Sequence, residues 1–338
     1  MRRFLWAVWT LALALTVALI TLWASLALWY RVPFAEAIRG LAAGVFALGG
    51  LATLVALFTR FRRPVLIAFL AAFVLMLSWW STIHPRADGD WSPDVARQTT
   101  GVIEGDILTL KDVRDFDWRS NTEFTERWTT RSYDLSKVKS VDLFLAFWAG
   151  PEIAHAIVSF EFEGGEFLAW SIEVRALKGG EFSPIADFFR NSPLVIIASD
   201  ERDVVRLRAT IRNERVELYR LKASPELARS VLIEYVADAN ELAETPRFYN
   251  SLTTNCTTAI VKIVRLAGIR VPFDWRLVVN GFLPDYLYNR GAVDTRIPLA
   301  ELRERAQISP RAHDADASPD FSRLIRVGVP SPFDDAKP

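Results

Sequence analysis

Residues 154–175, AHAIVSFEFEGGEFLAWSIEVR, decide the fold of the larger part of this chain. Two runs of apolar, β-branched and aromatic residues, Ala154–Glu163 and Glu166–Arg175, flank Gly164-Gly165. A glycine pair between two such runs is typical of a β-hairpin with a two-residue turn. Three further strands are predicted at 195–198, 204–211 and 215–221.

The pattern changes to helical spacing after these strands. Apolar residues recur every three to four positions from Pro225 to about Glu244, which predicts an amphipathic helix. A second helix is expected to be capped by Thr254 or Asn255 and to end at Gly268. Strands followed by helices predict an α+β domain.

The first eighty residues contain three long apolar stretches, Phe4–Trp29, Ile38–Phe58 and Pro64–Trp80. Each stretch is close to the roughly twenty residues that a helix needs to cross a bilayer. Six of the 12 tryptophans lie in this part, several of them near the ends of a stretch, as in an interfacial aromatic belt. We therefore expect three transmembrane helices; buried helices of a soluble protein are the alternative.

The arginines around these stretches indicate an orientation. Basic residues precede the first stretch and fill the loop between the second and third: Arg2, Arg3, Arg60, Arg62 and Arg63. The loop between the first and second stretches has only Arg31 and Arg39. The positive-inside rule then places the N-terminus in the cytoplasm and everything after the third span on the other side. For a bacterium, this means the inner membrane with a periplasmic domain.

These observations predict four parts of the chain. Residues 1–82 form the membrane anchor, 83–100 a linker and 101–308 the periplasmic α+β domain. The last part, 309–338, is rich in Pro, Asp and Ser, and we expect an extended or partly disordered tail.

Composition argues against several classes of function. The 40 basic and 40 acidic residues give no net charge, so no basic surface points to nucleic acid. Three histidines and one cysteine argue against a zinc site. No glycine-rich phosphate loop is present. We therefore expect no metal, no cofactor and no nucleic-acid partner.

The single cysteine, Cys256, is the first candidate for chemistry. It lies in YNSLTTNCTT, residues 249–258, at the predicted start of a helix. Helix N-termini carry partial positive charge and free N–H groups, which stabilise a thiolate over a thiol. Cys256 is thus a candidate nucleophile; the alternative is a small buried apolar residue.

A nucleophilic cysteine needs a base, and His155 is the best placed of the three histidines. His84 follows the last predicted span and His313 lies in the polar tail, whereas His155 begins the first strand of the hairpin. A strand histidine facing a cysteine at a helix start is the papain-like arrangement. Ser171 or Glu173, on the returning strand, would orient the ring, and the sequence does not separate them. A hydrogen-bonded structural histidine is the alternative.

Residues around the cysteine are candidates for binding the substrate. The backbone N–H of Cys256, with Asn255 or Asn250, would form an oxyanion hole, and Tyr249 lies beside them. Helix capping alone also explains Asn255.

A charged cluster at residues 200–208 has two interpretations. Arg206 and Arg208 would bind a phosphate head group through paired donors, and Arg206 is the candidate we retain for substrate binding. Alternatively, the cluster is a solvated turn entering a strand, fixed by arginine–carboxylate pairs, and this alternative is the one we favour.

Five segments of the chain resemble the Lnb N-terminal periplasmic domain family of bacteria. They are Val113–Ser120, Ile153–Phe162, Ser171–Arg175, Asp200–Arg208 and Phe248–Thr258, and the resemblance extends over about residues 100–290. The most specific pieces are FYNSLTTNCTT and AHAIVSF. The resemblance implies a circularly permuted, NlpC-type papain-like fold, in which histidine precedes cysteine along the chain, as His155 precedes Cys256.

The resemblance also implies an activity. The family's named member moves an acyl chain onto the N-terminal cysteine of a lipoprotein, and this chain differs from it in the three preceding membrane spans. We expect a cysteine acyltransferase or acyl hydrolase that acts on lipid or lipoprotein acyl groups through a thioester. The alternatives are a cell-wall amidase or peptidase with the same Cys-His dyad, and a non-catalytic envelope scaffold.

Overall fold

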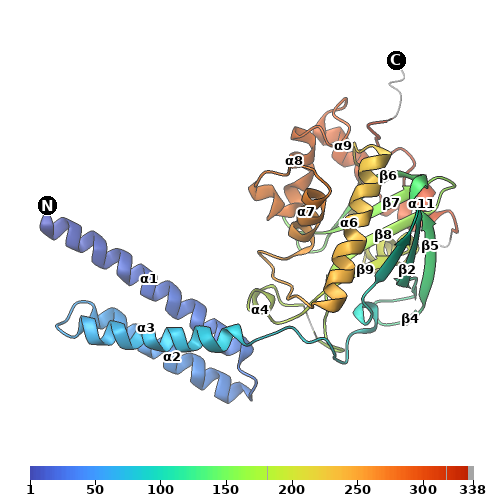
Figure 1. Ribbon diagram of the computed structural model, residues 1–338. Helices are drawn as coiled ribbons and strands as arrows, with labels where there is room; N and C mark the ends of the chain where they lie inside the picture. Colours follow the sequence, from blue (N-terminus) through green and yellow to red (C-terminus); the bar gives the residue numbers. More distant parts are fainter. Residues whose placement is uncertain (181, 317, 334–338) are drawn as a thin grey trace. The chain divides into compact units, whose positions relative to one another are not determined.

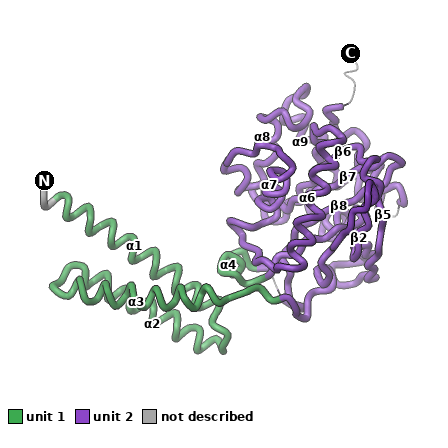
Figure 2. The backbone as a smooth tube through the Cα atoms, viewed as in Figure 1, with its two compact units in different colours: residues 1–86, 183–192 green, residues 87–182, 193–338 purple. Residues whose placement is uncertain are grey.

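The computed structural model describes residues 1–180, 182–316 and 318–333, and it divides into two compact units (Figures 1 and 2). The helical unit comprises residues 1–86 and 183–192, and the sheet unit comprises residues 87–182 and 193–338. The chain therefore passes from one unit to the other three times. Each unit is described by itself below.

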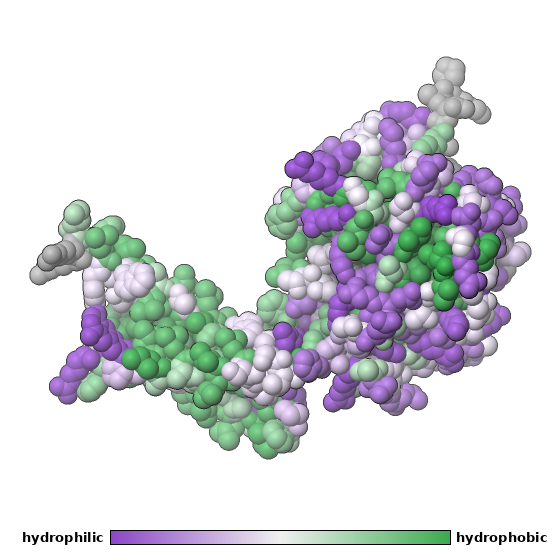
Figure 3. Space-filling view, viewed as in Figure 1, coloured by the Kyte–Doolittle hydropathy of each residue, from purple (hydrophilic) through white to green (hydrophobic). Residues whose placement is uncertain are grey.

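Three apolar helices make up most of the helical unit: α1 (Arg2–Arg31), α2 (Glu36–Ala56) and α3 (Arg62–Ser81). Each is long and apolar enough to cross a membrane. Large apolar side chains such as Leu11 and Leu75 point outward and are more than 70% exposed, and Figure 3 shows this apolar surface along the unit. A bilayer would cover such a surface. The prediction of three membrane-type helices is confirmed.

A ten-residue segment of distant sequence completes the helical unit. Residues 183–192 contain the short helix α4 (Pro184–Phe188), which Ser183 caps by accepting from the Ala186 N–H. Phe189 is 3% exposed and stacks on Tyr30 of α1, with ring centroids 5.6 Å apart. Arg190 donates to the Trp80 carbonyl of α3 at 3.0 Å. The predicted membrane anchor thus includes residues far from the N-terminus.

The sheet unit is built on a sheet with strand order β1-β2-β9-β8-β7-β6-β10, and β5 also pairs with β2. Only the β2–β9 pair is parallel. The strands are β1 (Thr100–Glu104), β2 (Ile107–Arg114), β5 (Trp128–Asp134), β6 (Val138–Phe147), β7 (Ala154–Phe162), β8 (Phe167–Val174), β9 (Leu194–Ser199) and β10 (Arg215–Arg220), with β3 (Asp117–Trp118) and β4 (Phe124–Thr125) in a separate ribbon.

The predicted hairpin is confirmed as β7–β8. Its turn holds Gly164 and Gly165 at φ of +95° and +86°, a region that glycine adopts without steric cost. The antiparallel pairing runs from Glu161–Phe167 to Ile157–Ser171 and stops there. The backbone pairing of the two strands therefore ends two residues after His155.

Helices cover both faces of the sheet. One face carries α6 (Pro225–Glu244), α7 (Cys256–Leu266), α8 (Leu283–Asn289) and α9 (Leu299–Ala306); the other carries α5 (Glu201–Arg206), the π-helical turn η3 (Leu207–Ile211), α10 (Ser309–Asp314) and α11 (Phe321–Leu324). Side chains alternate between faces along a strand, so Ala156 and Val158 join the first core and Ile157 the second. Short 3₁₀ turns are η1 (Pro93–Val95), η2 (Leu135–Lys137), η4 (Trp275–Leu277) and η5 (Asn280–Phe282). The α+β prediction is confirmed, and α6 and α7 occur where periodicity predicts them.

The predicted strand at 204–211 is wrong. These residues belong to α5 and η3, and Asp200 caps α5 by accepting from the Arg202 N–H at 2.9 Å. Glu201 and Asp203 are fully buried. The cluster is therefore not a solvated turn, although its arginine–carboxylate pairs are present: Asp203 accepts from Arg114 at 2.9 and 3.0 Å.

The prediction of an extended tail after residue 308 is also wrong for the described residues. Phe321 and Ile325 are fully buried in the second core. Arg326 donates to Asp142 and to both carboxylate oxygens of Glu201, at 2.6 to 2.9 Å. Aromatic and aliphatic anchors spaced along a Pro- and Asp-rich segment thus fix it onto the sheet.

The segment predicted as a linker, 83–100, is mostly part of the sheet unit. That unit begins at Ala87, and Val95 and Thr99 are buried within it. Gln98 donates to the carbonyls of Ile196 and Ala239, tying the segment to β9 and α6.

Candidate active site

Cys256 is the first residue of α7. Asn255 is the N-cap: its side-chain oxygen accepts from the Thr258 N–H, and the Thr258 hydroxyl accepts from the Asn255 N–H, both at 2.9 Å. This reciprocal capping box fixes where the helix begins. Cys256 is 6% exposed, so the helix start holds the thiol in a nearly enclosed position.

The start of β7 supplies the surroundings of the thiol. The thiol of Cys256 interacts with the imidazole of His155 and with the backbone N–H of Ala156, and both interactions lower the thiol pKa. Both contacts lie next to the point where β7 and β8 separate, since their pairing ends at Ile157–Ser171. The structure thus brings together the predicted cysteine and histidine, which are 101 positions apart in the sequence.

The other side of the imidazole faces β8. His155 Nε2 lies 2.8 Å from Ser171 Oγ and 3.1 Å from Glu173 Oε1. Ser171 Oγ in turn donates to Glu173 Oε1 at 2.6 Å. Ser171 and Glu173 are two apart on a strand and therefore share a face. Ser171 and Glu173, which the sequence left as alternatives, both contact the imidazole of His155 and also contact one another.

Arg208 fixes the carboxylate from the helical layer. It lies in the π-helical turn η3, a type of helix irregularity that is frequent at functional sites. Its guanidinium pairs with Glu173 and with Glu214, each at 3.3 Å. Arg208 is only 7% exposed, so Glu173 is held by a buried cation on one side and His155 on the other.

Burial and charge shift the titration of these groups in consistent directions. Burial alone raises the pKa of Cys256, but the hydrogen bond and charge of His155 and the Ala156 N–H more than offset it, so the thiol pKa is lowered. Burial and Arg208 lower the pKa of His155, but Glu173 and Cys256 outweigh them and raise it. Opposite shifts in a neighbouring thiol and imidazole favour the thiolate–imidazolium pair.

Glu173 stays ionised in this arrangement. Burial raises the pKa of its carboxyl, but His155, Arg208 and Ser171 together lower it well below the usual range. An ionised carboxylate accepts hydrogen bonds only. Ser171 must therefore donate to Glu173, and His155 Nε2–H donates toward Ser171 or Glu173.

Asn280 is a residue of this site that sequence reasoning missed. Its amide nitrogen donates to the Ala154 carbonyl at 2.6 Å and to Thr257 Oγ1 at 2.8 Å, and it lies 4.0 Å from Cys256 Sγ. Its oxygen accepts from the Ala154 N–H at 2.8 Å. Asn280 therefore connects Ala154, the residue before His155 in β7, to the first turn of α7, which contains Cys256.

Gly281, the next residue, allows the chain at Asn280 to approach the backbone of Pro151 and Glu152 closely. Its N–H donates to the Glu152 carbonyl at 2.8 Å, and a Cβ there would lie 2.0 Å from the Pro151 carbonyl oxygen. A polar Asn-Gly pair inside the apolar run from Leu277 to Leu283 was the one signal in the sequence. No periodicity connects that run to the hairpin.

The other predicted binding residues lie elsewhere or are already engaged. Asn255 donates to the Ser251 carbonyl and caps α7. The Asn250 oxygen accepts from two backbone N–H groups of its own turn. Tyr249 is 8% exposed, with its ring centroid 6.2 Å from that of Phe182. Arg206 pairs with Asp316 at 2.7 Å and donates to the Trp118 carbonyl, so the structure does not bring it to Cys256.

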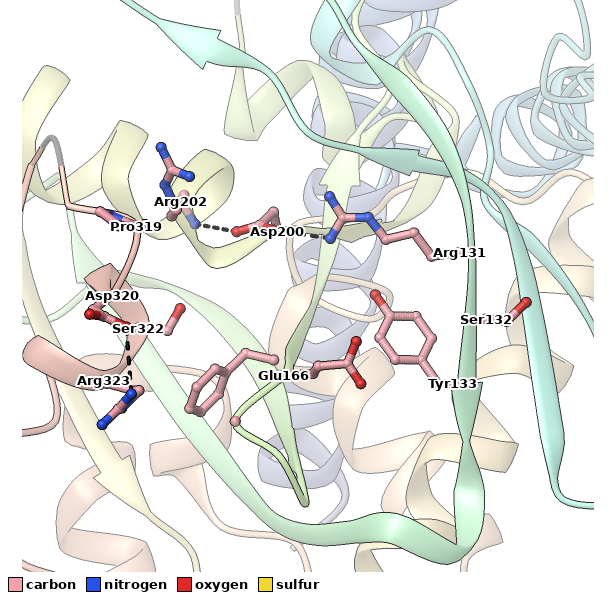
Figure 4. A pocket seen from close by; sticks show the side chains of 12 residues that line it. Arg131, Ser132, Tyr133, Glu166, Asp200, Arg202, Pro319, Asp320, Ser322 and Arg323 are labelled. Carbon is pink, nitrogen blue, oxygen red and sulfur yellow. Dashed lines mark hydrogen bonds and ion pairs between the residues drawn. The ribbon is translucent and has the colours of Figure 1, made fainter.

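Two hollows on the surface of the sheet unit are lined by residues other than Cys256 and His155. The larger has a volume of about 480 Å³ and lies at the β7–β8 turn, with Arg131, Glu166 and Asp200 among its lining residues (Figure 4). His155 is at the opposite end of β7, about 25 Å away at roughly 3.3 Å per residue. This hollow is therefore not part of the candidate site.

Comparison with known families gives a match. Residues 124–281 of this chain are similar to the family described as the Lnb N-terminal periplasmic domain. The resemblance inferred from the sequence is confirmed. No curated protein and no solved structure gave a match.

The matched range of the Lnb N-terminal periplasmic domain contains the whole candidate site. It extends from β4 into η5 and includes His155, Arg208, Cys256 and Asn280. The helices α8 to α11 lie after it, as does Arg326. The three membrane-type helices precede a periplasmic-type domain, which fits a membrane-anchored protein.

Proposed function

We propose that this chain is a cysteine-dependent acyltransferase or acyl hydrolase that acts on lipid or lipoprotein acyl groups at the membrane. The observation that carries the proposal is the arrangement of Cys256 beside His155, whose ring is hydrogen-bonded to Ser171 and paired with Glu173. Nucleophile, base and orienting group stand in the order that covalent catalysis needs. The proposed fold is the permuted papain-like one, supported by a strand histidine that precedes a helix-start cysteine.

The first half of the reaction forms a thioester. His155 Nε2 is occupied by Ser171 and Glu173, so the other ring nitrogen, Nδ1, takes the proton of Cys256. The thiolate attacks the acyl carbonyl carbon, and the electron pair of the C=O bond moves onto oxygen. The backbone N–H of Cys256 at the helix start is suited to bind this oxyanion, a role worth about 3–4 kcal/mol of barrier.

Collapse of the tetrahedral intermediate releases the first product. The C–O or C–N bond to the leaving group breaks, and the imidazolium of His155 returns its proton to that group. An amine or water then attacks the thioester with His155 again as base, which regenerates the Cys256 thiol. An amine gives acyl transfer and water gives hydrolysis. The lowered pKa of Cys256 favours the attacking thiolate in the first half.

The proposed location is the bacterial inner membrane, with the N-terminus in the cytoplasm and the catalytic domain in the periplasm. The arginines between α2 and α3 support this orientation through the positive-inside rule. The partners we propose are membrane lipid or lipoprotein substrates. The described residues contain no group of three or more metal-ligating side chains, and the mechanism uses no metal.

Intact-protein mass spectrometry tests the thioester. The full-length chain is purified in native lipid as wild type, Cys256→Ala, His155→Ala and His313→Ala. His313 is an exposed histidine that lies 3.3 Å from Asn213, so its replacement is the matched control. We expect an added mass equal to a fatty acyl group, removed by hydroxylamine, in wild type and His313→Ala only.

Three outcomes contradict the proposal. An adduct that persists in Cys256→Ala would place the acyl group elsewhere. A folded wild type whose Cys256 reacts with no thiol reagent at any pH would favour the non-catalytic scaffold. Release of fragments from peptidoglycan without any requirement for lipid would favour the amidase alternative, since it needs the same dyad but another substrate.

A further inference from the structure

The loop after α7 exposes large apolar side chains. Gly268, at φ +89°, ends the helix, and the chain continues to η4 at Trp275. Phe273 is 81% exposed, and Trp275 and Leu266 are each 56% exposed. Phe273 is the most exposed aromatic side chain among the described residues. Exposed aromatic residues of this size mark interaction sites when they are held together.

Hydrogen bonds hold this loop in a defined conformation. Arg265 Nε donates to the Val271 carbonyl at 3.0 Å, which ties the end of α7 to the loop. Asp274 accepts from both the N–H and the side chain of Arg276 at 2.9 Å. The Trp275 ring lies 5.3 Å from that of Phe282. The outward position of Phe273 is therefore a property of an ordered loop.

The sequence of α7 and the following loop is basic, although Lys262 pairs with Asp238 and Glu241 of α6 and Arg276 pairs with Asp274. Residues 256–276 contain four basic residues, Lys262, Arg265, Arg270 and Arg276, and one acidic residue, Asp274. The whole chain has no net charge, so this excess is local. Aromatic side chains among arginines suit an anionic lipid surface, where rings enter the interface and cations meet phosphates.

We propose that the loop 268–276 docks on the surface of the membrane that the same chain's α1, α2 and α3 cross. The covalent attachment to three apolar helices keeps a bilayer near the sheet unit throughout. A second copy of the chain is a poorer occupant: a stable protein interface buries about 800 Å² per partner. Three partly exposed side chains, at about 150–250 Å² for each aromatic, supply less than that.

Docking of the loop fixes the distance between Cys256 and the membrane surface, whatever reaction Cys256 performs. Cys256 begins α7 and Leu266 ends it, so the helix is eleven residues long. At about 1.5 Å per residue, the helix spans roughly 16 Å. A loop seated in the head-group region therefore keeps Cys256 within about one helix length of the lipid carbonyl groups.

Site-specific fluorescence in proteoliposomes tests the proposal. The full-length chain with Cys256→Ser has no other cysteine, so Phe273→Cys or Trp275→Cys introduces a single labelling site. Val102→Cys is the matched control, since Val102 is 57% exposed on β1 of the same unit. Each variant carries the same environment-sensitive dye in phosphatidylglycerol–phosphatidylethanolamine vesicles. The quenchers are lipids with a nitroxide near the head group, and iodide in the water.

We expect nitroxide lipids to quench the dye at positions 273 and 275 at least twofold more than at 102, and iodide to quench it less. Replacing phosphatidylglycerol by phosphatidylcholine should reduce the lipid quenching at 273, since the basic residues lose their anionic partners. Iodide quenching at 273 equal to that at 102 would overturn the proposal. Protection of position 273 from both quenchers would also overturn it, because a protein partner would then cover the loop.

Discussion

Arg326 offers a quantitative test of how the C-terminal segment is held. Its guanidinium donates to Glu201 Oε1 and Oε2 at 2.6 and 2.8 Å and to Asp142 Oδ2 at 2.9 Å. Both carboxylates are fully buried. The guanidinium carbon also lies 4.0 Å from the ring centroid of Phe167. Arg326→Ala therefore removes a buried cation and leaves two buried anions behind.

The expected cost follows from what remains. Asp142 keeps an ion pair with Arg220 at 2.6 Å, but Glu201 keeps only the hydroxyl of Ser159, at 2.5 Å. Removing one partner of a buried ion pair costs about 3–5 kcal/mol, because the remaining charge is uncompensated. Since whole domains are stable by about 5–15 kcal/mol, this is a large fraction of the free energy of unfolding.

Arg323→Ala is the matched control, three residues earlier in the same segment. Arg323 pairs with Asp320, and the two side chains are 71% and 63% exposed. Such exposed pairs are worth about 0–1 kcal/mol. Urea unfolding of the full-length chain in detergent, followed by tryptophan fluorescence, gives both free energies. A loss below about 1 kcal/mol in Arg326→Ala would refute the reasoning. Recovery of part of the loss in Arg326→Met with Glu201→Gln would support it.

Three further changes test the site. Glu173→Gln should move the alkylation of Cys256 by iodoacetamide to higher pH, because the carboxylate that stabilises the imidazolium is lost; an unchanged profile would argue against the relay. The folded-state pKa of Glu173 lies below the ordinary value of 4.5. The carboxylate therefore stabilises the folded protein above pH 4.5, and this stabilisation is lost as the pH falls through the folded-state pKa. The free energy of unfolding of Glu173→Gln, measured against pH, should lack this decrease; the same decrease in Glu173→Gln would contradict the assignment. Asn280→Ala should lower the alkylation rate and cost about 1–3 kcal/mol through unsatisfied backbone groups, and rates equal to wild type would deny its positioning role. Gly281→Ala should also reduce the rate of alkylation of Cys256, since the new Cβ would lie 2.0 Å from the Pro151 carbonyl oxygen. An unaffected rate would mean that the backbone at Pro151 shifts to accommodate the methyl group without displacing Asn280.

Patterns confined to one element were predictable from the sequence. The hairpin at Gly164-Gly165, the helices α6 and α7 and the three membrane-type helices each carry their periodicity within about twenty residues. The proximity of Cys256 to His155 was predictable because a helix N-terminus favours a thiolate, and a histidine at the end of a strand can face it. Ser171 and Glu173 remained unresolved, since their shared face gives both of them access to the ring.

The failures have identifiable physical causes. Residues 204–211 are rich in β-branched side chains, which favour a strand locally. Asp200 and the acids of the next turn are N-terminal helix signals, and in this segment they prevail over that preference. Composition obscured the apolar anchors Phe321 and Ile325 in the tail. Asn280 contacts Ala154, 126 positions away, and no local pattern reports a contact of that separation.

The division of the helical unit between two stretches of sequence has a consequence for biosynthesis. The helices α1, α2 and α3 leave the ribosome first, but Phe189 and Arg190, which pack against α1 and α3, follow about a hundred residues later. The helical unit therefore cannot reach its final packing until β1 to β8 have been synthesised. Removing residues 1–86 to obtain a soluble protein would uncover Phe189 and its neighbours, so such a truncation should aggregate unless residues 183–192 are replaced by a polar turn.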